Sequence, residues 1–281
     1  MEGTAREAID EDEISGAAVP SNGSNGATVE ETRRNAFSEL MGRKAKVQPG
    51  QLKQLKSSSE LFLGRDGLGA YVKAPGSFSP ERVIYHNEKW VVLNDLYPKS
   101  SVHVLLLPRD SNRNKLHPFE AFEDPVFLAD VKAEVNKLRL LVAKELRRRY
   151  GQFSAQDQAY GQVIEGHPPP KELPLGRDWE KSVISGIHAH PSMNHLHVHV
   201  LAVDRFSPCM KKKKHYNSFA TPFLIDVEDF PLKPDDLRRH PGRQGYLDAD
   251  LKCWRCGKGF KNRFGRFKEH LAEEYEAWKK E

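Results

Sequence analysis

Three histidines alternate with aliphatic residues in the run HLHVHVL at positions 195–201. A period of two is typical of a β-strand, which sends alternate side chains to opposite faces. We therefore expect a strand over 195–204 whose aliphatic members face a core, while His195, His197 and His199 line the other face. An imidazole can act near neutral pH as a nucleophile, as a general acid or base, or as a metal ligand.

The residues of this run leave three interpretations open. The first is a structural strand with solvated histidines. The second is a metal site, since His-x-His is a common ligand pair, although no carboxylate or cysteine lies close to the run in the sequence. The third is nucleophilic catalysis by the middle imidazole.

Composition limits the class of protein. The chain has 281 residues and a formal net charge of +5, with no apolar run near the ~18 residues that a membrane-spanning helix needs. The N-terminus is acidic and has no apolar segment of the secretory type. Two of the three cysteines form a Cys-x-x-Cys pair, which favours a metal site in a reducing compartment over disulfides.

The pattern along the chain predicts three parts. Residues 1–59 are polar and turn from acidic to basic, so we expect a disordered tail. Within it, 35–41 has the pattern of a short amphipathic helix, either a nascent helix or a docking peptide for a protein partner. A compact domain is expected over 60–225, and a second, small one over 226–281 that needs a staple because its own core is small.

The central domain reads as α+β, with an antiparallel sheet and flanking helices. Asp124 and Pro125 open a long helical pattern that ends in a basic turn before Gly151. A proline-rich loop follows at 168–170. The remaining expected elements are a short helix over 66–72 and strands over 82–86, 89–95, 102–107, 182–190 and 195–204.

The C-terminal part contains the elements of a zinc finger. Cys253, Cys256 and His270 have the spacing of zinc ligands. Glu274 lies four residues after His270, and on a helix these positions share a face, so Glu274 is expected to supply the fourth ligand. Glu273 points about 100° away and is the less favoured alternative. The expected cofactor is therefore one structural zinc ion.

Several segments together resemble a known family. The run His-Φ-His-Φ-His-Φ-Φ (Φ, apolar) resembles the signature of the histidine-triad nucleotide hydrolases and transferases. Residues 95–99 (DLYPK) and 103–108 (HVLLLP) resemble the ribose-binding strand of that family, and 186–193 (GIHAHPSM) run directly into the triad. The segments 207–211 (SPCMK) and 214–219 (KHYNSF) are similar to those of the aprataxin family.

This resemblance extends from about Leu68 to the end of the chain. Aprataxins join a histidine-triad domain to a C-terminal zinc finger, and a Cys-Cys-His-Glu ligand set resembles that of the fungal members. Animal members also have an N-terminal phosphopeptide-binding domain. This chain has a polar tail in that place, so it resembles the shorter fungal type.

The resemblance implies removal of AMP from 5′-adenylated DNA, the product of a ligation that failed to seal a break. His197 would attack the AMP phosphorus and form a covalent histidine–AMP, and AMP would be the product. His195 and His199 would orient the nucleophile and contact phosphate, while His188 and His103 would protonate or stabilise the leaving phosphate. His103 lies in an apolar strand and can also be a core residue. No catalytic metal is expected.

Further residues are implied in substrate binding. Asp95 would bind the ribose hydroxyls, and phosphate oxygens would contact Lys99, Ser192, Lys211 and Ser218. The basic run 211–214 can also be a solvated face or part of a nuclear localisation patch. Leu68 and Tyr71 lie where the family places a wedge that stacks on the terminal base.

The finger is rich in basic residues that would contact DNA phosphates without reading sequence, Lys258 and Lys261 among them. The expected partners are adenylated nicked or broken DNA, including RNA–DNA junctions, and a repair protein bound by the tail, with no membrane. The expected location is the nucleus. Two alternatives are a hydrolase of small adenylated molecules, such as an adenosine phosphoramidate or dinucleotide, and a non-catalytic module that marks breaks.

Overall fold

The computed structural model describes residues 64–165 and 176–281. The expected tail over 1–59, its helix at 35–41 and the proline-rich loop at 168–170 lie outside these residues. Within the described ranges, none of the helices has the length and apolar character that crossing a bilayer requires.

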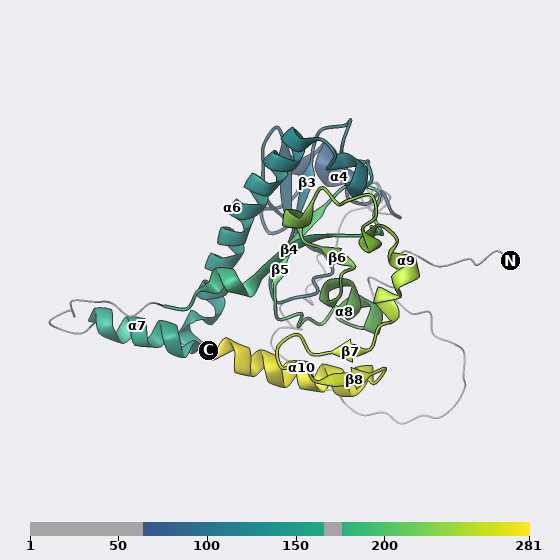
Figure 1. Ribbon diagram of the computed structural model, residues 1–281. Helices are drawn as coiled ribbons and strands as arrows, with labels where there is room; N and C mark the ends of the chain where they lie inside the picture. Colours follow the sequence, from purple (N-terminus) through teal and green to yellow (C-terminus); the bar gives the residue numbers. More distant parts are fainter. Residues whose placement is uncertain (1–63, 166–175) are drawn as a thin grey trace, which may run out of the picture.

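A six-stranded antiparallel sheet forms the centre of the molecule, in the spatial order β1-β2-β3-β5-β4-β6 (Figure 1). The strands predicted over 82–86, 89–95 and 102–107 correspond to the first three. The α+β fold with an antiparallel sheet is confirmed. The strands are β1 Val83–His86, β2 Trp90–Asn94, β3 His103–Pro108, β4 Val183–His188, β5 Val198–Ala202 and β6 Leu224–Ile225.

Helices surround this sheet, and the longest, α6, runs diagonally along one side of it (Figure 1). The helix expected over 66–72 is present but begins at Gly69, because residues 64–68 form turns. The helices are α4 Gly69–Lys73, α5 Pro118–Ala121, α6 Pro125–Tyr150, α7 Ala155–Glu165, α8 Lys213–Ala220, α9 Pro241–Gln244 and α10 Phe264–Lys279.

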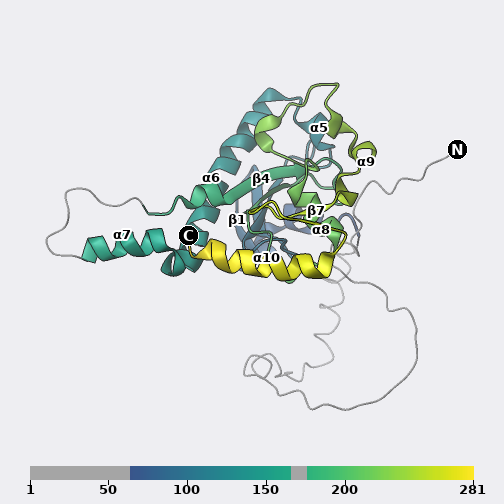
Figure 2. The same cartoon turned by 60° about the horizontal axis from the view of Figure 1, so that its bottom comes forward.

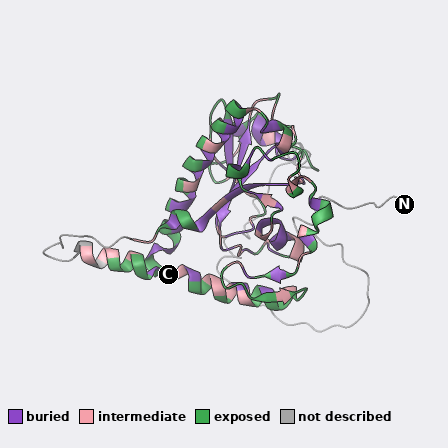
Figure 3. Ribbon diagram, viewed as in Figure 1, coloured by how far each residue is buried: buried purple, intermediate pink, exposed green. Residues whose placement is uncertain are grey.

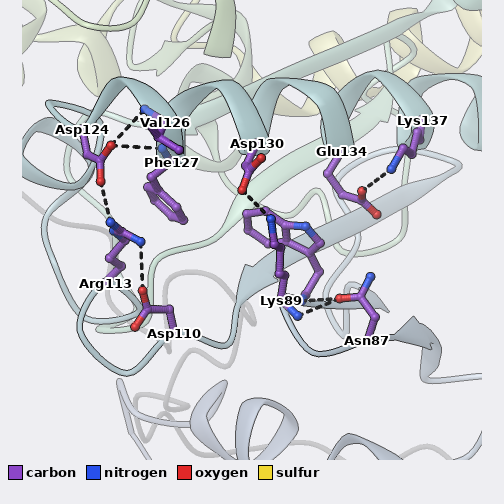
Figure 4. A network of polar contacts seen from close by, with 11 residues as sticks. Asn87, Lys89, Asp110, Arg113, Asp124, Val126, Phe127, Asp130, Glu134 and Lys137 are labelled. Atoms are coloured by element: carbon purple, nitrogen blue, oxygen red, sulfur yellow. Dashed lines mark hydrogen bonds and ion pairs between the residues drawn. The ribbon is translucent and has the colours of Figure 1, made fainter.

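Helix α6 begins where the sequence predicts. The Asp124 carboxylate accepts hydrogen bonds from the backbone N–H groups of Val126 (2.9 Å) and Phe127 (3.2 Å), which otherwise lack helical partners. Arg113, from the loop after β3, forms an ion pair with the same carboxylate (Figure 4). The start of the helix is therefore fixed both locally and by a neighbouring loop.

The main core lies between α6 and one face of the sheet (Figure 3). Buried residues of α6 recur along its inner face and meet Val104, Val198 and Val200 from the sheet. Leu196 joins the same cluster, so the predicted orientation of the alternating aliphatic residues is confirmed. A smaller cluster on the opposite face joins α4 to Leu105 and Leu107 of β3.

The strand predicted over 195–204 is shorter than expected and begins at Val198. The backbone N–H groups of Asn194 and Leu196 bond to the carbonyls of Arg65 and Asn114, in separate loops, and not to neighbouring strands. The strand predicted over 182–190 likewise ends at His188, because the N–H of Ala189 bonds to the Phe223 carbonyl. Only His199 of the triad therefore lies in the ladder, where it pairs with Leu105 and Gly186.

The C-terminal part packs against the central domain. Its hairpin, β7 (Leu251–Lys252) and β8 (Gly259–Lys261), pairs antiparallel, and α10 follows. Figure 2 shows α10 running across the molecule, with its end near the start of α7. The buried side chain of Trp278 on α10 joins the main core, as do Val227, Phe230 and Leu232, which follow the expected boundary at 225.

Candidate active site and metal centre

A cavity of about 310 Å³ opens on the sheet face opposite α6. Residues from β3, β4, β5, α4 and α8 surround it. It brings together predicted site residues that are up to 150 positions apart in the chain. Those that line it are Leu68, Tyr71, Asp95, Lys99, His188, Ser192, His197, His199 and Ser218.

His197 is held in one tautomer by its own backbone. Its Nδ1 lies 2.7 Å from the carbonyl oxygen of His195, and a carbonyl oxygen can only accept a hydrogen bond. Nδ1 therefore carries the proton, which leaves the lone pair on Nε2. This interaction is available because the chain at 195–197 has not yet entered the ladder. The free lone pair is what an attacking imidazole requires.

A chain of hydrogen bonds fixes the tautomers of two more histidines. The backbone N–H of Lys99 donates to Nδ1 of His103 (3.1 Å), so the proton of that ring lies on Nε2. Nε2 of His103 in turn lies 3.0 Å from Nδ1 of His199 and donates to it. The proton of His199 is thereby placed on Nε2. His103 itself does not line the cavity, but its hydrogen bond holds the His199 ring, which does.

Four buried nitrogens of cavity-lining residues have no hydrogen-bond partner among the described residues. Nδ1 of His190 and Nε2 of His215 are two of them, and the other two are Nε2 of His199 and Nε2 of His188, on adjacent rings. The two rings lie 4.5 Å apart between their centroids, with Phe219 against both. Buried polar atoms are rarely left unsatisfied, so such atoms at a cavity wall indicate where a polar ligand contacts the protein. For His199, the assigned tautomer makes this atom a hydrogen-bond donor.

Burial keeps these imidazoles neutral. It lowers the pKa of His103 to about 4. It also lowers the pKa of His197, and that of His188 and of His199 falls well below the usual value. In each case desolvation of the charged ring is the largest cause, and neighbouring histidines add to it for all but His197. A neutral His197 retains its nucleophilic lone pair near neutral pH.

His195 differs from the other two triad members because its ring does not line the cavity. The ring is buried under α4, and a Cβ atom built on Gly69 would lie 2.7 Å from its Cε1. Only a glycine therefore lets α4 approach this closely. The contribution of His195 to the site is its carbonyl, which holds His197.

The predicted substrate-binding residues occupy different depths. Asp95 lies 3.5 Å from Nδ1 of His103 at the cavity wall. Lys99 is buried and its ammonium donates to the Tyr97 carbonyl, while the Ser218 hydroxyl donates to the His215 carbonyl (3.1 Å). Lys211 is exposed and does not line the cavity.

Leu68 and Tyr71 form an apolar wall of the cavity and are buried, not displayed on an open surface. Arg82 reinforces this wall: its guanidinium donates to the Tyr71 hydroxyl (2.7 Å) and lies 4.9 Å from the centre of that ring. Arg82 was not predicted from the sequence, because no motif surrounds it. It lines the cavity because the backbone pairing with Asn94 places it there. His215, a buried cavity residue, was likewise given no role from the sequence.

The predicted zinc ligands converge. One ligand atom each from Cys253, Cys256, His270 and Glu274 lie within 4.8 Å of one another. Sγ of Cys256 is 3.1 Å from Nε2 of His270, which is 3.4 Å from Glu274. Two thiols, an imidazole and a carboxylate at this separation fit a tetrahedral zinc ion. Glu273 lies on the other side of the His270 ring, by Nδ1, and is exposed.

Ligand atoms of a second group, Asp95, His103 and His199, also lie within 4.8 Å of one another. Two of its nitrogens, Nε2 of His103 and Nδ1 of His199, are already hydrogen-bonded to each other. These two nitrogens are therefore already engaged with each other within the protein.

The finger surface carries exposed cations, among them the predicted Lys258 and Lys261. Arg255 does not belong with them. Its guanidinium forms ion pairs with Glu281 (2.5 Å) and with the Glu274 carboxylate (2.6 Å), so it orients a metal ligand. Cations of the finger that enter no ion pair with another described residue include Lys252, Lys258, Lys261, Arg263, Arg266 and Lys268.

Family comparisons agree with this two-part architecture. Residues 77–206 match the HIT domain, and residues 220–277 match the C2HE / C2H2 / C2HC zinc-binding finger. The aprataxin-like protein of Schizosaccharomyces pombe is 34% identical over 76% of this chain and 82% of its own length. The aprataxin-like protein of Saccharomyces cerevisiae is 31% identical over 75% of this chain and 95% of its own.

Solved structures give the same relationship. The crystal structure of the aprataxin ortholog Hnt3 in complex with DNA superposes with a TM-score of 0.60 at 32% identity, covering 76% of this chain and 96% of that one. A complex of Hnt3 with DNA and guanosine has a TM-score of 0.59 at 31% identity, with the same coverage.

Proposed function

This chain belongs to the aprataxin family, and we propose that it removes AMP from 5′-adenylated DNA ends. The observation that carries the proposal is the fixed tautomer of His197, whose Nδ1 is bound to the His195 carbonyl while the ring lines the cavity. This arrangement supports attack by Nε2 on the AMP phosphorus.

In the first step, the lone pair on Nε2 of His197 forms a bond to the AMP phosphorus. The bond from that phosphorus to the bridging oxygen breaks, and its electron pair leaves on the 5′-phosphate of the DNA. The ring becomes a cation whose Nδ1–H still donates to the His195 carbonyl, which stabilises the charge. The unpartnered Nε2–H of His199 is aimed to stabilise charge on the phosphoryl oxygens.

In the second step, water attacks the phosphorus of the histidine–AMP. The nitrogen–phosphorus bond breaks, its electron pair returns to His197, and one water proton passes to solvent. The products are AMP and a neutral enzyme. His188 faces the same region with an unpartnered nitrogen and is proposed to contact the phosphate that leaves.

The remaining residues are proposed to bind the substrate. Asp95 would hold the ribose hydroxyls, Lys99, Ser192 and Ser218 the phosphate oxygens, and Lys211 a phosphate outside the cavity. Leu68 and Tyr71 offer an apolar surface for a base, buttressed by Arg82.

We assign catalysis to residues 60–225 and DNA binding to residues 226–281. The exposed lysines Lys258 and Lys261 would contact DNA phosphates without reading sequence. Cys253, Cys256, His270 and Glu274 would hold a zinc ion that supplies folding energy and no chemistry at the phosphate. A substrate of broken DNA is in keeping with action in the nucleus.

The test compares two substrates, an adenylated nicked duplex and a small adenylated amine. Wild type should release AMP from the duplex far more efficiently than from the amine, His197→Ala should release none, and His86→Ala, at an exposed position, should match wild type. Equal release from both substrates would favour a hydrolase of small molecules. Binding of the duplex without turnover would leave only a break-marking role.

A further inference from the structure

A second cavity of about 200 Å³ adjoins the catalytic one, and His190 lines both. It lies between the segment before α5 and the segment that enters α9, two regions more than 120 residues apart in the chain. Its walls are His117, Phe119, Ala189, His190, Arg239, His240, Pro241 and Arg243.

The charge of this cavity is of one sign. Its lining contains two arginines and three histidines and no carboxylate. Arg243 and His240 are exposed, and neither side chain has an ion pair or hydrogen bond with another described residue. Cationic side chains gathered without a protein counter-charge indicate an anionic ligand.

Two further groups that line this cavity, Arg239 and His190, have nitrogen atoms that are available to such a ligand. Arg239 donates to the carbonyls of Lys233 (2.9 Å) and Leu232 (2.8 Å) through Nε and Nη2, which fixes its guanidinium and leaves Nη1 without a partner in the described part of the chain. Its guanidinium carbon also lies 5.3 Å from the centre of the Phe119 ring. Nδ1 of His190 is buried and has no partner either.

The pKa of His117 reflects the positive charges near the cavity. Its Nδ1 accepts from the Phe119 N–H, so it serves as part of the wall. Its pKa is lowered first by burial and then by the charges of His190 and Arg239. His117 is therefore neutral near neutral pH, and the permanent positive charge of the cavity comes from Arg239 and Arg243.

We propose that this cavity binds a backbone phosphate of the DNA whose adenylated end occupies the catalytic cavity. The inference rests on the proposed function. The shared wall at His190 places the second cavity beside the first, so a polyanion that extends from the catalytic cavity reaches it directly. A contact to a backbone phosphate carries no sequence information, which fits an enzyme that acts at any sequence.

The substitution that tests this site is Arg243→Glu, because Arg243 is exposed and unpaired and its loss leaves the fold intact. Lys144→Glu on α6 makes the same change of charge at an exposed residue that lines neither cavity. Substrates are adenylated single strands of increasing length and a small adenylated amine. Circular dichroism of each variant monitors folding.

For Arg243→Glu, KM should rise about tenfold for long adenylated strands and remain at the wild-type value for the amine and for strands too short to reach the site. The slope of log KM against log salt should fall by about one, the contribution of one phosphate contact. Lys144→Glu should show neither effect. Equal KM values for Arg243→Glu and Lys144→Glu at every length would overturn the proposal.

Binding measurements separate this proposal from the proposed function. Affinity for an unadenylated nicked duplex should fall about tenfold in Arg243→Glu whether or not wild type releases AMP. If AMP release fails but this difference in binding persists, the proposed function is wrong and the phosphate site stands. If Arg243→Glu weakens inhibition by inorganic phosphate without changing DNA binding, the site takes a free anion and the proposal is overturned.

Discussion

Nε2 of His103 donates to Nδ1 of His199 across 3.0 Å, from one strand of the sheet to its neighbour. His103 receives a hydrogen bond from the Lys99 backbone N–H in turn, so the position of the proton on His199 is set by a main-chain group two hydrogen bonds away. The orientation of the His199 ring, which lines the cavity, thus depends on the His103 ring, which does not.

His103→Ala should therefore lower kcat by about 100-fold with little change in KM, because it releases His199 from its tautomer and orientation. His103→Asn retains a side-chain donor and should recover part of this loss. Single-turnover kinetics on an adenylated nicked duplex would measure both. A KM effect equal to the kcat effect, or no recovery by asparagine, would indicate that His103 is only a packing residue.

Stability should fall as the pH is lowered from 7 to 5. The folded-state pKa of His103 is about 4, below its unfolded value near 6.5, so the unfolded chain binds the extra proton first as pH falls. This residue alone should remove about 2 kcal/mol of stability between pH 7 and pH 5. His188, His197 and His199 shift in the same direction and add to the loss.

Urea unfolding at the two pH values measures this difference. Few carboxylates titrate in this window, so the histidines dominate it. A substrate analogue bound in the cavity should raise the free energy of unfolding at each pH by its mass-action contribution. Stability that is unchanged or greater at pH 5 would show that the buried rings are not neutral.

The last turn of α10 should be essential to the whole chain. The Trp278 indole is 2% exposed and contacts Tyr150 and Trp179, with the Arg177 guanidinium 5.0 Å from its ring centre. Trp278→Ala should cost about 3–5 kcal/mol. Leu237→Ala, at a side chain that is 65% exposed, should cost less than about 0.5 kcal/mol.

Calorimetry would also show whether the finger and the sheet unfold together. Because Trp278 joins the main core, one transition is expected in wild type, and its midpoint should fall in Trp278→Ala. Two separate transitions in wild type would contradict this coupling.

Removal of zinc should affect stability before chemistry. After extensive dialysis, wild type and Glu273→Ala should each retain about one zinc per chain, whereas Glu274→Ala should lose most of it, because only Glu274 lies within the ligand cluster. Chelation should lower the thermal midpoint while AMP release from a small adenylated amine persists at low temperature. Equal zinc retention by the two glutamate variants would remove Glu274 from the ligand set.

Local patterns predicted much of this molecule. The alternation at 195–201 oriented Leu196 and Val198 toward the core, Asp124 marked the start of α6, and the spacing of Cys253 and His270 predicted the metal cluster. Each of these features depends on residues that are close together in the sequence, so a periodicity or a residue spacing is enough to predict it.

Features made by distant segments could not be predicted in the same way. The strand at the triad starts late because Arg65 and Asn114 capture backbone N–H groups from other loops. Arg82 lines the catalytic cavity because strand pairing brings it there. Arg239 and His190 are far apart in the sequence and line the second cavity together only in the folded chain. The sequence does not show that Arg255 differs from the other basic residues of the finger, because its partners, Glu274 and Glu281, become its neighbours only when α10 packs.

The most direct test of the account is to trap the reaction intermediate. An adenylated duplex labelled in the AMP phosphate would be mixed with wild type, quenched in alkaline denaturant within the first turnover, and the digested protein analysed by mass spectrometry. AMP should be attached to the peptide that contains His197, through an alkali-stable and acid-labile bond, and His197→Ala should carry no label. Label on another residue, or AMP release with no labelled protein at any time, would contradict this expectation.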